Sequence, residues 1–296
     1  MHNHENHHKH SHEPYDGPQA VCFGEILFDH IGDKLHLGGA PLNFAYYLAQ
    51  LGIATGIVSA VGADELGNRA IKMLYDANID CRWVAESEMP TGVVEVSLVD
   101  GQPSYTIVEG VAWDNIPVPY EIGGELFYFG TLAQRTAVNR ETAHSISHHP
   151  FKHVFLDVNL RQNYYAPPII VSSLSHSTFV KMNEEEWPTI SRITASPTIE
   201  NLITRYNLHG VALTKGENGA TLMTRRQELS HPGFPAEVVD TVGAGDAFSA
   251  VIAASLLLDI PLELALESAC RIGAYVVGNA GAQVPLTEEL KSLLRV

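Results

Sequence analysis

The sequence lacks long apolar runs and is poor in cysteine. No apolar stretch approaches the roughly 20 residues that a membrane-spanning helix requires, so no membrane span is expected. The first residues have no apolar core of the kind found in secretory signals. The three cysteines, Cys22, Cys81 and Cys270, stand far apart without zinc-ligand spacing, which indicates reduced thiols and a cytoplasmic location.

Positive charge is also scarce. The chain has 18 Lys and Arg against 34 Asp and Glu, a formal net charge of −16. Such a balance argues against nucleic acid or an anionic membrane as a partner. A phosphate-bearing ligand would have to be held locally, by backbone amides, a few basic side chains and a divalent cation.

Histidine, in contrast, is concentrated at the start, where six of the first twelve residues are His. Metal capture is one interpretation. A disordered tail over residues 1–17, natural or added as a tag, is the favoured one, because such tracts need no core.

Residues 18–296 are predicted to form one α/β domain. Apolar strand-like runs alternate with helix-like segments, beginning with the run Ala20–Asp29 and the helical pattern of residues 40–52. This alternation is typical of a mostly parallel sheet covered on both faces, a three-layer α/β/α core.

Residues 90–109 interrupt the alternation. They read as two β-strands around an Asp-Gly-Gln-Pro turn, with Val94, Val96 and Leu98 on one face. Together with the short segment 30–37, residues 88–112 are expected to form a small inserted β lid. An exposed apolar face of this lid could also mediate a homodimer.

The stretch VDTVGAGDAFSA, residues 239–250, carries the strongest chemical signal. The Gly243-Ala244-Gly245 turn before an apolar helix offers free amides to an anion, and Asp246 follows directly. Asp246 could accept the proton of a substrate hydroxyl as it attacks a phosphoryl group. The alternative is an acidic residue that merely stabilises a helix start.

A second stretch, LGGAPLNFA, has features of a polyol site. Gly38 and Gly39 allow close backbone approach, and Asn43 near a helix start offers a donor and an acceptor. Asp29, at the expected end of an apolar strand, could accept two sugar hydroxyls. A structural turn with a surface Asn and a solvated Asp is the alternative.

Three further strand ends suggest a nucleotide side. Asn183 and Glu186 could order water around Mg²⁺, or they could form an acidic helix start. Thr214, with Gly216 and Gly219, could admit a triphosphate or ribose, or form an ordinary hairpin. Arg161 could clamp a phosphate or pair with a carboxylate.

In combination and order these motifs resemble the PfkB/ribokinase family of sugar kinases, from about Val21 to Leu286. The family's two signatures appear as GGAPLNFAYYLAQLG, followed by VGADELG, and as DTVGAGDAFSA. FGEILFD, WDNI, FGTLAQR, DVNLR and KMNEEE are most similar to the fructokinase branch. Val158 departs from that branch, where a proline is common.

The resemblance implies a ribokinase-like fold and a set of roles. Asp246 would be the catalytic base, the amides of Gly243, Ala244 and Gly245 the anion hole, and Arg161 a neighbour of the transferred phosphate. The sugar would be bound by Asp29, Gly38, Gly39 and Asn43. The nucleotide pocket would be lined by Asn183, Thr214, Gly216, Gly219 and Asn279. Glu186 would serve Mg²⁺ through water, and Asp240 a monovalent cation such as K⁺.

The expected activity is ATP-dependent phosphorylation of a sugar, with fructose favoured. Ribose, 2-keto-3-deoxygluconate or a nucleoside such as adenosine is the alternative substrate; the first signature has no Arg or Lys for an acidic sugar. A catalytically silent sugar-binding protein on the same fold is the rival from another class. The intact Asp246 and glycines argue against it.

Overall fold

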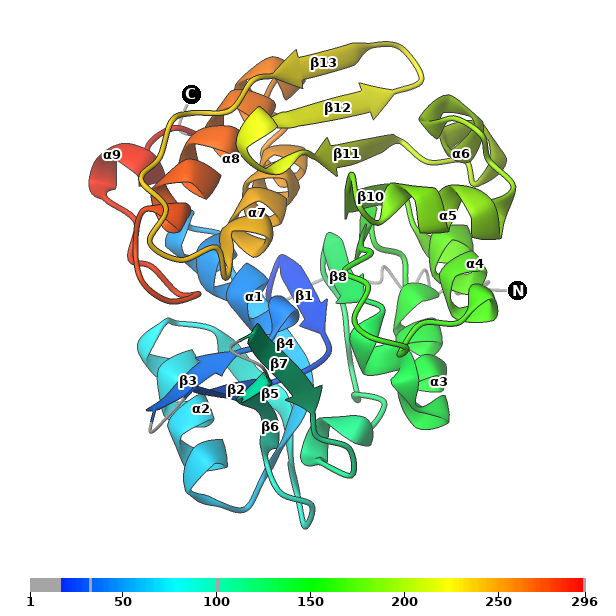
Figure 1. Cartoon of the computed structure of the whole chain (residues 1–296). Helices are drawn as coiled ribbons and strands as arrows, with labels where there is room; N and C mark the ends of the chain where they lie inside the picture. Colours follow the sequence, from blue (N-terminus) through cyan, green and yellow to red (C-terminus); the bar gives the residue numbers. More distant parts are fainter. Residues whose placement is uncertain (1–16, 32–33, 100–101, 295–296) are drawn as a thin grey trace, which may run out of the picture.

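A mixed sheet forms the centre of the computed structural model, which describes residues 17–31, 34–99 and 102–294 (Figure 1). Within these ranges its strand order is β13-β12-β11-β10-β9-β8-β1-β4-β5. From β5 to β11 all neighbours pair in parallel, whereas β12 and β13 are antiparallel. The strands are β1 (Ala20–Phe23), β4 (Thr55–Gly62), β5 (Asp80–Ser87), β8 (Leu126–Gly130), β9 (His153–Asp157), β10 (Phe179–Asn183), β11 (Gly210–Thr214), β12 (Ala220–Thr224) and β13 (Glu228–His231).

Helices cover both faces of this sheet. In β1 the side chain of Cys22 packs into one apolar cluster, while its neighbours Val21 and Phe23 pack into another. The Cys22 cluster takes in α1 (Ala40–Gln50), α2 (Glu65–Asp76), α7 (Ala244–Leu257), α8 (Leu262–Val277) and α9 (Glu288–Lys291). The other takes in α3 (Ala137–Ser147), α4 (Pro167–His176), α5 (Trp187–Thr194) and α6 (Ile199–Arg205). The predicted three-layer arrangement is confirmed.

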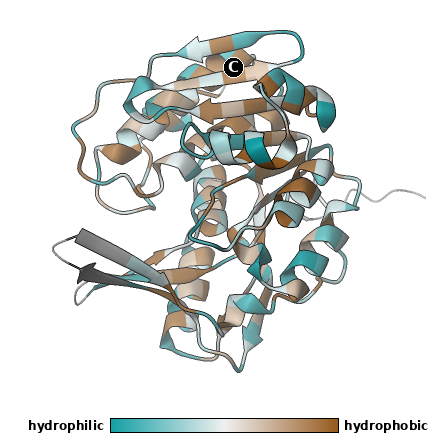
Figure 2. Ribbon diagram, turned by 45° about the vertical axis from the view of Figure 1, so that its right-hand side comes forward, coloured by the Kyte–Doolittle hydropathy of each residue, from teal (hydrophilic) through white to brown (hydrophobic). Residues whose placement is uncertain are grey.

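The chain also forms short 3₁₀ turns, η1 (Ala112–Asp114), η2 (Leu132–Arg135) and η3 (Gly216–Asn218). Figure 2 shows apolar residues along the strands of the main sheet and many polar residues on the outer turns of the helices. No helix within the described ranges combines the length and apolar character needed to cross a bilayer.

A separate four-stranded sheet has the order β3-β2-β6-β7. Its strands are β2 (Leu27–Ile31), β3 (Lys34–Gly38), β6 (Gly92–Val99) and β7 (Gln102–Ile107). β2 pairs antiparallel with β3 and parallel with β6, and β6 pairs antiparallel with β7. Of the face expected to mediate a dimer, Val94 is buried in this chain's own core. The side chains of Val96 and Leu98, residues 32–33 and 100–101 of the expected lid, and residues 1–16 of the expected tail lie outside what the structure describes.

The prediction of one continuous strand over Ala20–Asp29 is wrong. β1 ends at Phe23 in the main sheet, and β2 starts at Leu27 in the second sheet. Gly24 lies between them with φ 143°, and a Cβ there would come within 2.6 Å of Pro41. The chain therefore changes sheet here, and Asp29 lies within β2 rather than at the end of a parallel strand of the core.

The parallel strands bring several segments to one edge of the main sheet. β9 ends at Asp157, β10 at Asn183 and β11 at Thr214. Since the carboxyl ends of parallel strands share an edge, these residues lie on the side where ligands usually bind in α/β sheets. The chain between β1 and β2 also starts from this edge.

Candidate active site

Asp246 lies in the first turn of α7, where Asn43 of α1 contacts it. The Asn43 Nδ2 donates to Oδ2 of Asp246 at 2.8 Å, and Gln283 Nε2 donates to Oδ1 of Asn43 at 2.9 Å. Gln283 Nε2 also donates to the Leu37 carbonyl at 3.1 Å. The amide of Asn43 is thus fixed at both ends and presents a donor to the carboxylate. The helix-start alternative accounts for the position of Asp246 but not for this contact.

The turn before Asp246 requires glycine. Gly243 is the N-cap of α7, with φ 80° and no side-chain cap, and a Cβ there would lie 2.4 Å from the Ala282 carbonyl oxygen. A Cβ on Gly245 would lie 3.2 Å from Nζ of Lys181. The first amides of a helix have no partner within the helix, so this terminus suits an anion.

The environment of Asp246 makes it a weaker acid. Burial, followed by the charge of Asp157, raises its pKa to about 6, against the hydrogen bond from Asn43 and the charges of Lys181 and Arg161. A carboxyl group with this pKa is mostly ionised at neutral pH and is a better proton acceptor than an ordinary aspartate.

Beneath Asp246 lies a buried polar network that the sequence analysis missed. Lys181 Nζ lies 3.2 Å and 3.3 Å from the two carboxylate oxygens of Asp157, and Ser249 Oγ donates to Asp157 at 3.0 Å. Asp157 and Lys181 are register partners on β9 and β10. The sequence signal was present: each is a charged residue at or near the end of an apolar strand.

The expected sugar residues lie around the start of α1. A Cβ on Gly38 would lie 3.0 Å from Asp29 Oδ2, and one on Gly39, with φ 112°, would lie 2.3 Å from the Glu25 carbonyl oxygen. Glycine is thus required at position 39, where the Glu25 backbone approaches closely, whereas at position 38 only the end of the Asp29 side chain would have to move. Burial raises the pKa of Asp29, while the charges of Arg161 and His36 oppose that rise.

Glu25 is a second carboxyl group that the sequence analysis missed. It is 3% exposed, and burial raises its pKa to about 7, with the charge of Asp246 adding to the rise. In the sequence, Glu25 stands out only as a charged residue within the apolar stretch FGEILFD, where the chain changes sheet.

Asn183 and Glu186 form a reciprocal pair at the end of β10. The Asn183 amide donates to Glu186 Oε2, the Glu186 amide donates to Asn183 Oδ1, and Leu160 N donates to Glu186 Oε1, each at 2.8 Å. Both oxygens of Glu186 thus already accept backbone hydrogen bonds. Their remaining lone pairs fit the water-mediated contact to Mg²⁺ expected from the sequence. Arg161, just beyond Leu160, is exposed.

The Asp240 carboxylate hydrogen-bonds to the loop before α7 and to the loop after α8. Its Oδ1 accepts from Val242 N and its Oδ2 from Gly281 N, both at 3.0 Å. Asn279 Nδ2 donates to the Tyr275 carbonyl at 2.7 Å. Next to it lies a cavity of about 440 Å³, which falls within the usual size range of small-ligand sites. Its walls include Phe234, Val239, Arg271, Tyr275, Asn279 and Leu290.

Thr214, Gly216 and Gly219 lie at the hairpin between β11 and β12. The two strands are antiparallel, and Gly219 has φ 78° where a Cβ would come within 2.0 Å of the His231 carbonyl oxygen. The positive φ of Gly219 in the hairpin and the close approach of the end of β13 both require glycine there, so the hairpin named as the alternative describes the local structure of these residues.

Comparison with known proteins identifies the family of this chain. Residues 19–289 match the sequence model of the pfkB family carbohydrate kinases. A fructokinase from Rhizobium leguminosarum bv. trifolii is 30% identical over 275 residues, 81% of this chain and 80% of that protein. The ribokinase of Bacillus subtilis is 27% identical over 263 residues, 87% of each protein. The solved structure of a fructokinase from Xylella fastidiosa with bound ATP has a TM-score of 0.83 at 23% identity, covering 94% of this chain and 98% of that one. The chain belongs to the pfkB family of carbohydrate kinases and is therefore a sugar kinase, a phosphotransferase with a hydroxyl group as acceptor.

Proposed function

We propose that this sugar kinase is an ATP-dependent fructokinase. The observation that carries the phosphotransfer chemistry is the 2.8 Å hydrogen bond from Asn43 that orients Asp246 beside the amides of Gly243 and Gly245. A base and an anion-binding helix terminus stand side by side, as the transfer of a phosphoryl group to a hydroxyl requires.

In the proposed reaction a hydroxyl oxygen of the sugar forms a bond to the γ-phosphorus as the bond to the β–γ bridging oxygen breaks. ADP leaves with that electron pair, and Asp246 takes the hydroxyl proton. The amides at the start of α7 stabilise the charge on the transferring group. A pKa of about 6 leaves Asp246 ionised at neutral pH and ready to accept that proton.

The sugar is assigned to the space bordered by Asp29, Gly38, Gly39 and Asn43, with Arg161 near the transferred phosphate. The first signature carries neither Arg nor Lys, which favours a neutral sugar over an acidic one. The 30% identity to the fructokinase of Rhizobium leguminosarum bv. trifolii favours fructose. Ribose is the second candidate, because the ribokinase is nearly as similar.

ATP is assigned to the cavity beside Asn279, with Thr214, Gly216, Gly219 and Asn183 toward its phosphates. The bound ATP of the Xylella fastidiosa structure supports a nucleotide on this fold. Mg²⁺, when bound, neutralises charge on the phosphates, and Glu186 orients the water around it. Asp240 and the carbonyls near Val242 and Gly281 are the proposed K⁺ ligands.

The second sheet is the proposed lid. Its strand β2 carries Asp29 and its strand β3 ends at Gly38, and both residues are assigned to the sugar. Closure of this sheet would therefore cover the sugar and exclude water that would otherwise hydrolyse ATP. The proposal also includes a homodimer through the lid and a cytoplasmic location. A monomeric mass in light scattering at micromolar concentration would contradict the dimer alone.

A coupled ADP-release assay with MgATP tests the function. The panel contains fructose, ribose, glucose, 2-keto-3-deoxygluconate, adenosine and fructose 6-phosphate. Fructose is expected to give turnover well above the sugar-free rate and the highest kcat/KM. If another member of the panel gives the highest kcat/KM, the fructose assignment is wrong while the sugar-kinase chemistry stands. Ligand-induced thermal stabilisation without turnover on any member would instead favour a silent sugar-binding protein.

A further inference from the structure

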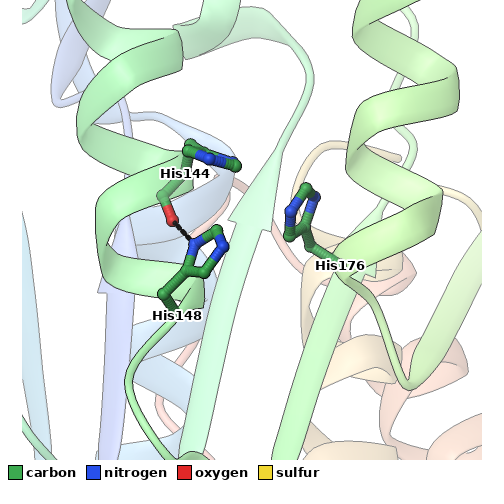
Figure 3. A group of neighbouring side chains, drawn as sticks. All are labelled: His144, His148 and His176. Carbon is green, nitrogen blue, oxygen red and sulfur yellow. Dashed lines mark hydrogen bonds between the residues drawn. The ribbon is translucent and has the colours of Figure 1, made fainter.

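Three histidines gather on the sheet face covered by α3 and α4. His144 lies in the last turn of α3, His148 is the residue that caps that helix, and His176 ends the adjacent helix α4. Figure 3 shows the three rings facing one another across the two helices. Their ring centroids lie 4.3, 4.7 and 5.2 Å apart. In the described part of the chain they form the one group of three metal-ligating side chains with ligand atoms all within 4.8 Å of one another.

Two of the rings are held in a tautomer that suits metal binding. The Nδ1 of His148 lies 2.7 Å from the carbonyl oxygen of His144, and the Nδ1 of His176 lies 2.7 Å from that of Ser172. A carbonyl can only accept, so each Nδ1 carries a proton and each neutral ring keeps its lone pair on Nε2. Histidine ligands of metals commonly donate their second ring N–H to a backbone carbonyl in this way.

The surroundings favour a cation. Both helices end at the cluster, and the carboxyl end of a helix carries partial negative charge. Arg140, a basic side chain in the wall of the cavity beside the rings, donates to the carbonyls of Gln134 and Arg135.

A cavity adjoins the rings. It measures about 320 Å³, and its walls include His144, His176, Arg140, Ser147, Ser172 and Gln134. A metal held by three histidines keeps a position for water or a small ligand, and the cavity leaves room on that side.

The cluster is separate from the active site. β9 starts at His153 and β10 at Phe179, soon after the cluster residues, whereas the active-site residues Asp157 and Asn183 end the same strands. The two sites therefore lie at opposite edges of the sheet.

We propose that His144, His148 and His176 bind one divalent first-row transition metal ion, of the Zn²⁺ class, and thereby join the ends of α3 and α4. With metal–nitrogen distances of ~2.0–2.1 Å, tetrahedral ligand atoms stand about 3.3 Å apart, so small side-chain rotations close the observed spacing. Imidazole suits zinc, nickel, copper and cobalt and is a poor ligand for Mg²⁺.

The test is thermal unfolding of the full chain with and without ZnCl₂, together with visible absorption on addition of CoCl₂. The histidines among the first twelve residues are retained in every variant, so any metal that they take up is the same in all of them and a difference between variants reports on the cluster. The expected rise in Tm is at least about 5 °C at a zinc concentration a hundredfold above the dissociation constant. Co²⁺ is expected to give the intense visible bands of a tetrahedral site.

His144→Ala and His176→Ala are each expected to abolish the rise in Tm and the Co²⁺ bands. His149→Ala removes a neighbouring exposed histidine whose ring lies against Phe151, outside the cluster, and is expected to retain both. Circular dichroism and the metal-free Tm establish that each variant folds. Equal metal responses in wild type, His144→Ala and His176→Ala, or none in wild type, would overturn the proposal.

Discussion

Asn43 and Asp246 stand 203 residues apart in the sequence and are joined by a 2.8 Å hydrogen bond. The same helix, α1, also fixes the loop that follows α8: the Tyr47 hydroxyl donates to the Ala282 carbonyl at 2.8 Å, and the Gln50 side chain accepts from Leu286 N at 2.8 Å. Ala282 is also the residue against which Gly243 packs. The position of Asp246 is therefore set by α1 and this loop together.

The wild-type enzyme should lose activity as the pH falls through about 6. In the proposed reaction Asp246 must be ionised to accept the sugar's proton, and burial and the charge of Asp157 raise its pKa to about 6. We expect kcat/KM for the sugar to rise with pH to a plateau near neutrality. Sugar-dependent ADP release from about pH 5 to 8 measures it. A flat profile across that range would remove Asp246 from the titrating step.

Asn43→Ala should move this acid limb to higher pH and raise KM for the sugar. The hydrogen bond from Asn43 lowers the pKa of Asp246, so its loss lets that pKa rise. Asn201→Ala is the matched control, because Asn201 is an exposed asparagine on α6 whose side chain contacts Thr198 and none of the residues around Asp246. The measurement is the pH midpoint of the acid limb of kcat/KM in each variant. An unchanged midpoint in Asn43→Ala would show that the hydrogen bond does not set the pKa of Asp246.

Lys181→Met should destabilise the fold by about 3–5 kcal/mol, because it leaves Asp157 buried without its counter-charge. Asp157→Asn should also be destabilising, since it leaves Lys181 buried without its partner. The double variant should be less destabilised than the sum of the two, as for any coupled pair. Urea unfolding of the four proteins measures this coupling. Additive losses would mean that the pair is not an interacting unit.

Gly243→Ala should reduce both stability and turnover. The new Cβ would be strained at φ 80° and would clash with the Ala282 carbonyl, displacing the start of α7. Gly52→Ala is the control: its φ is 84°, but no atom lies within 4 Å of the added Cβ. The control should lose roughly 1–2 kcal/mol through backbone strain and keep its kcat. Turnover lost equally in both would point to a global effect rather than to the anion-binding turn.

The sequence predicted the layers, the second sheet and the turn at Gly243, because each has a local pattern: strand and helix periodicity, an Asp-Gly turn, and glycines before a helix. It did not reveal the change of sheet at Gly24, since the apolar run continues through it and the close approach of Pro41 comes from a distant segment. Nor did it reveal the partners of Asp246. Gln283 and Lys181 reach the site through strand register and loop packing, which no local motif records.

Fructose-dependent ADP release by Asp246→Asn, measured beside wild type and Asp259→Asn, tests the central claim most directly. Asp259 is an exposed aspartate just beyond α7, and its carboxylate lies 3.5 Å from Nζ of Lys152, so its variant should match wild type. Asp246→Asn should keep the fold and nucleotide binding while kcat falls roughly 10²–10⁴-fold, the usual contribution of a general base. Near-normal turnover in a folded Asp246→Asn protein would contradict the account.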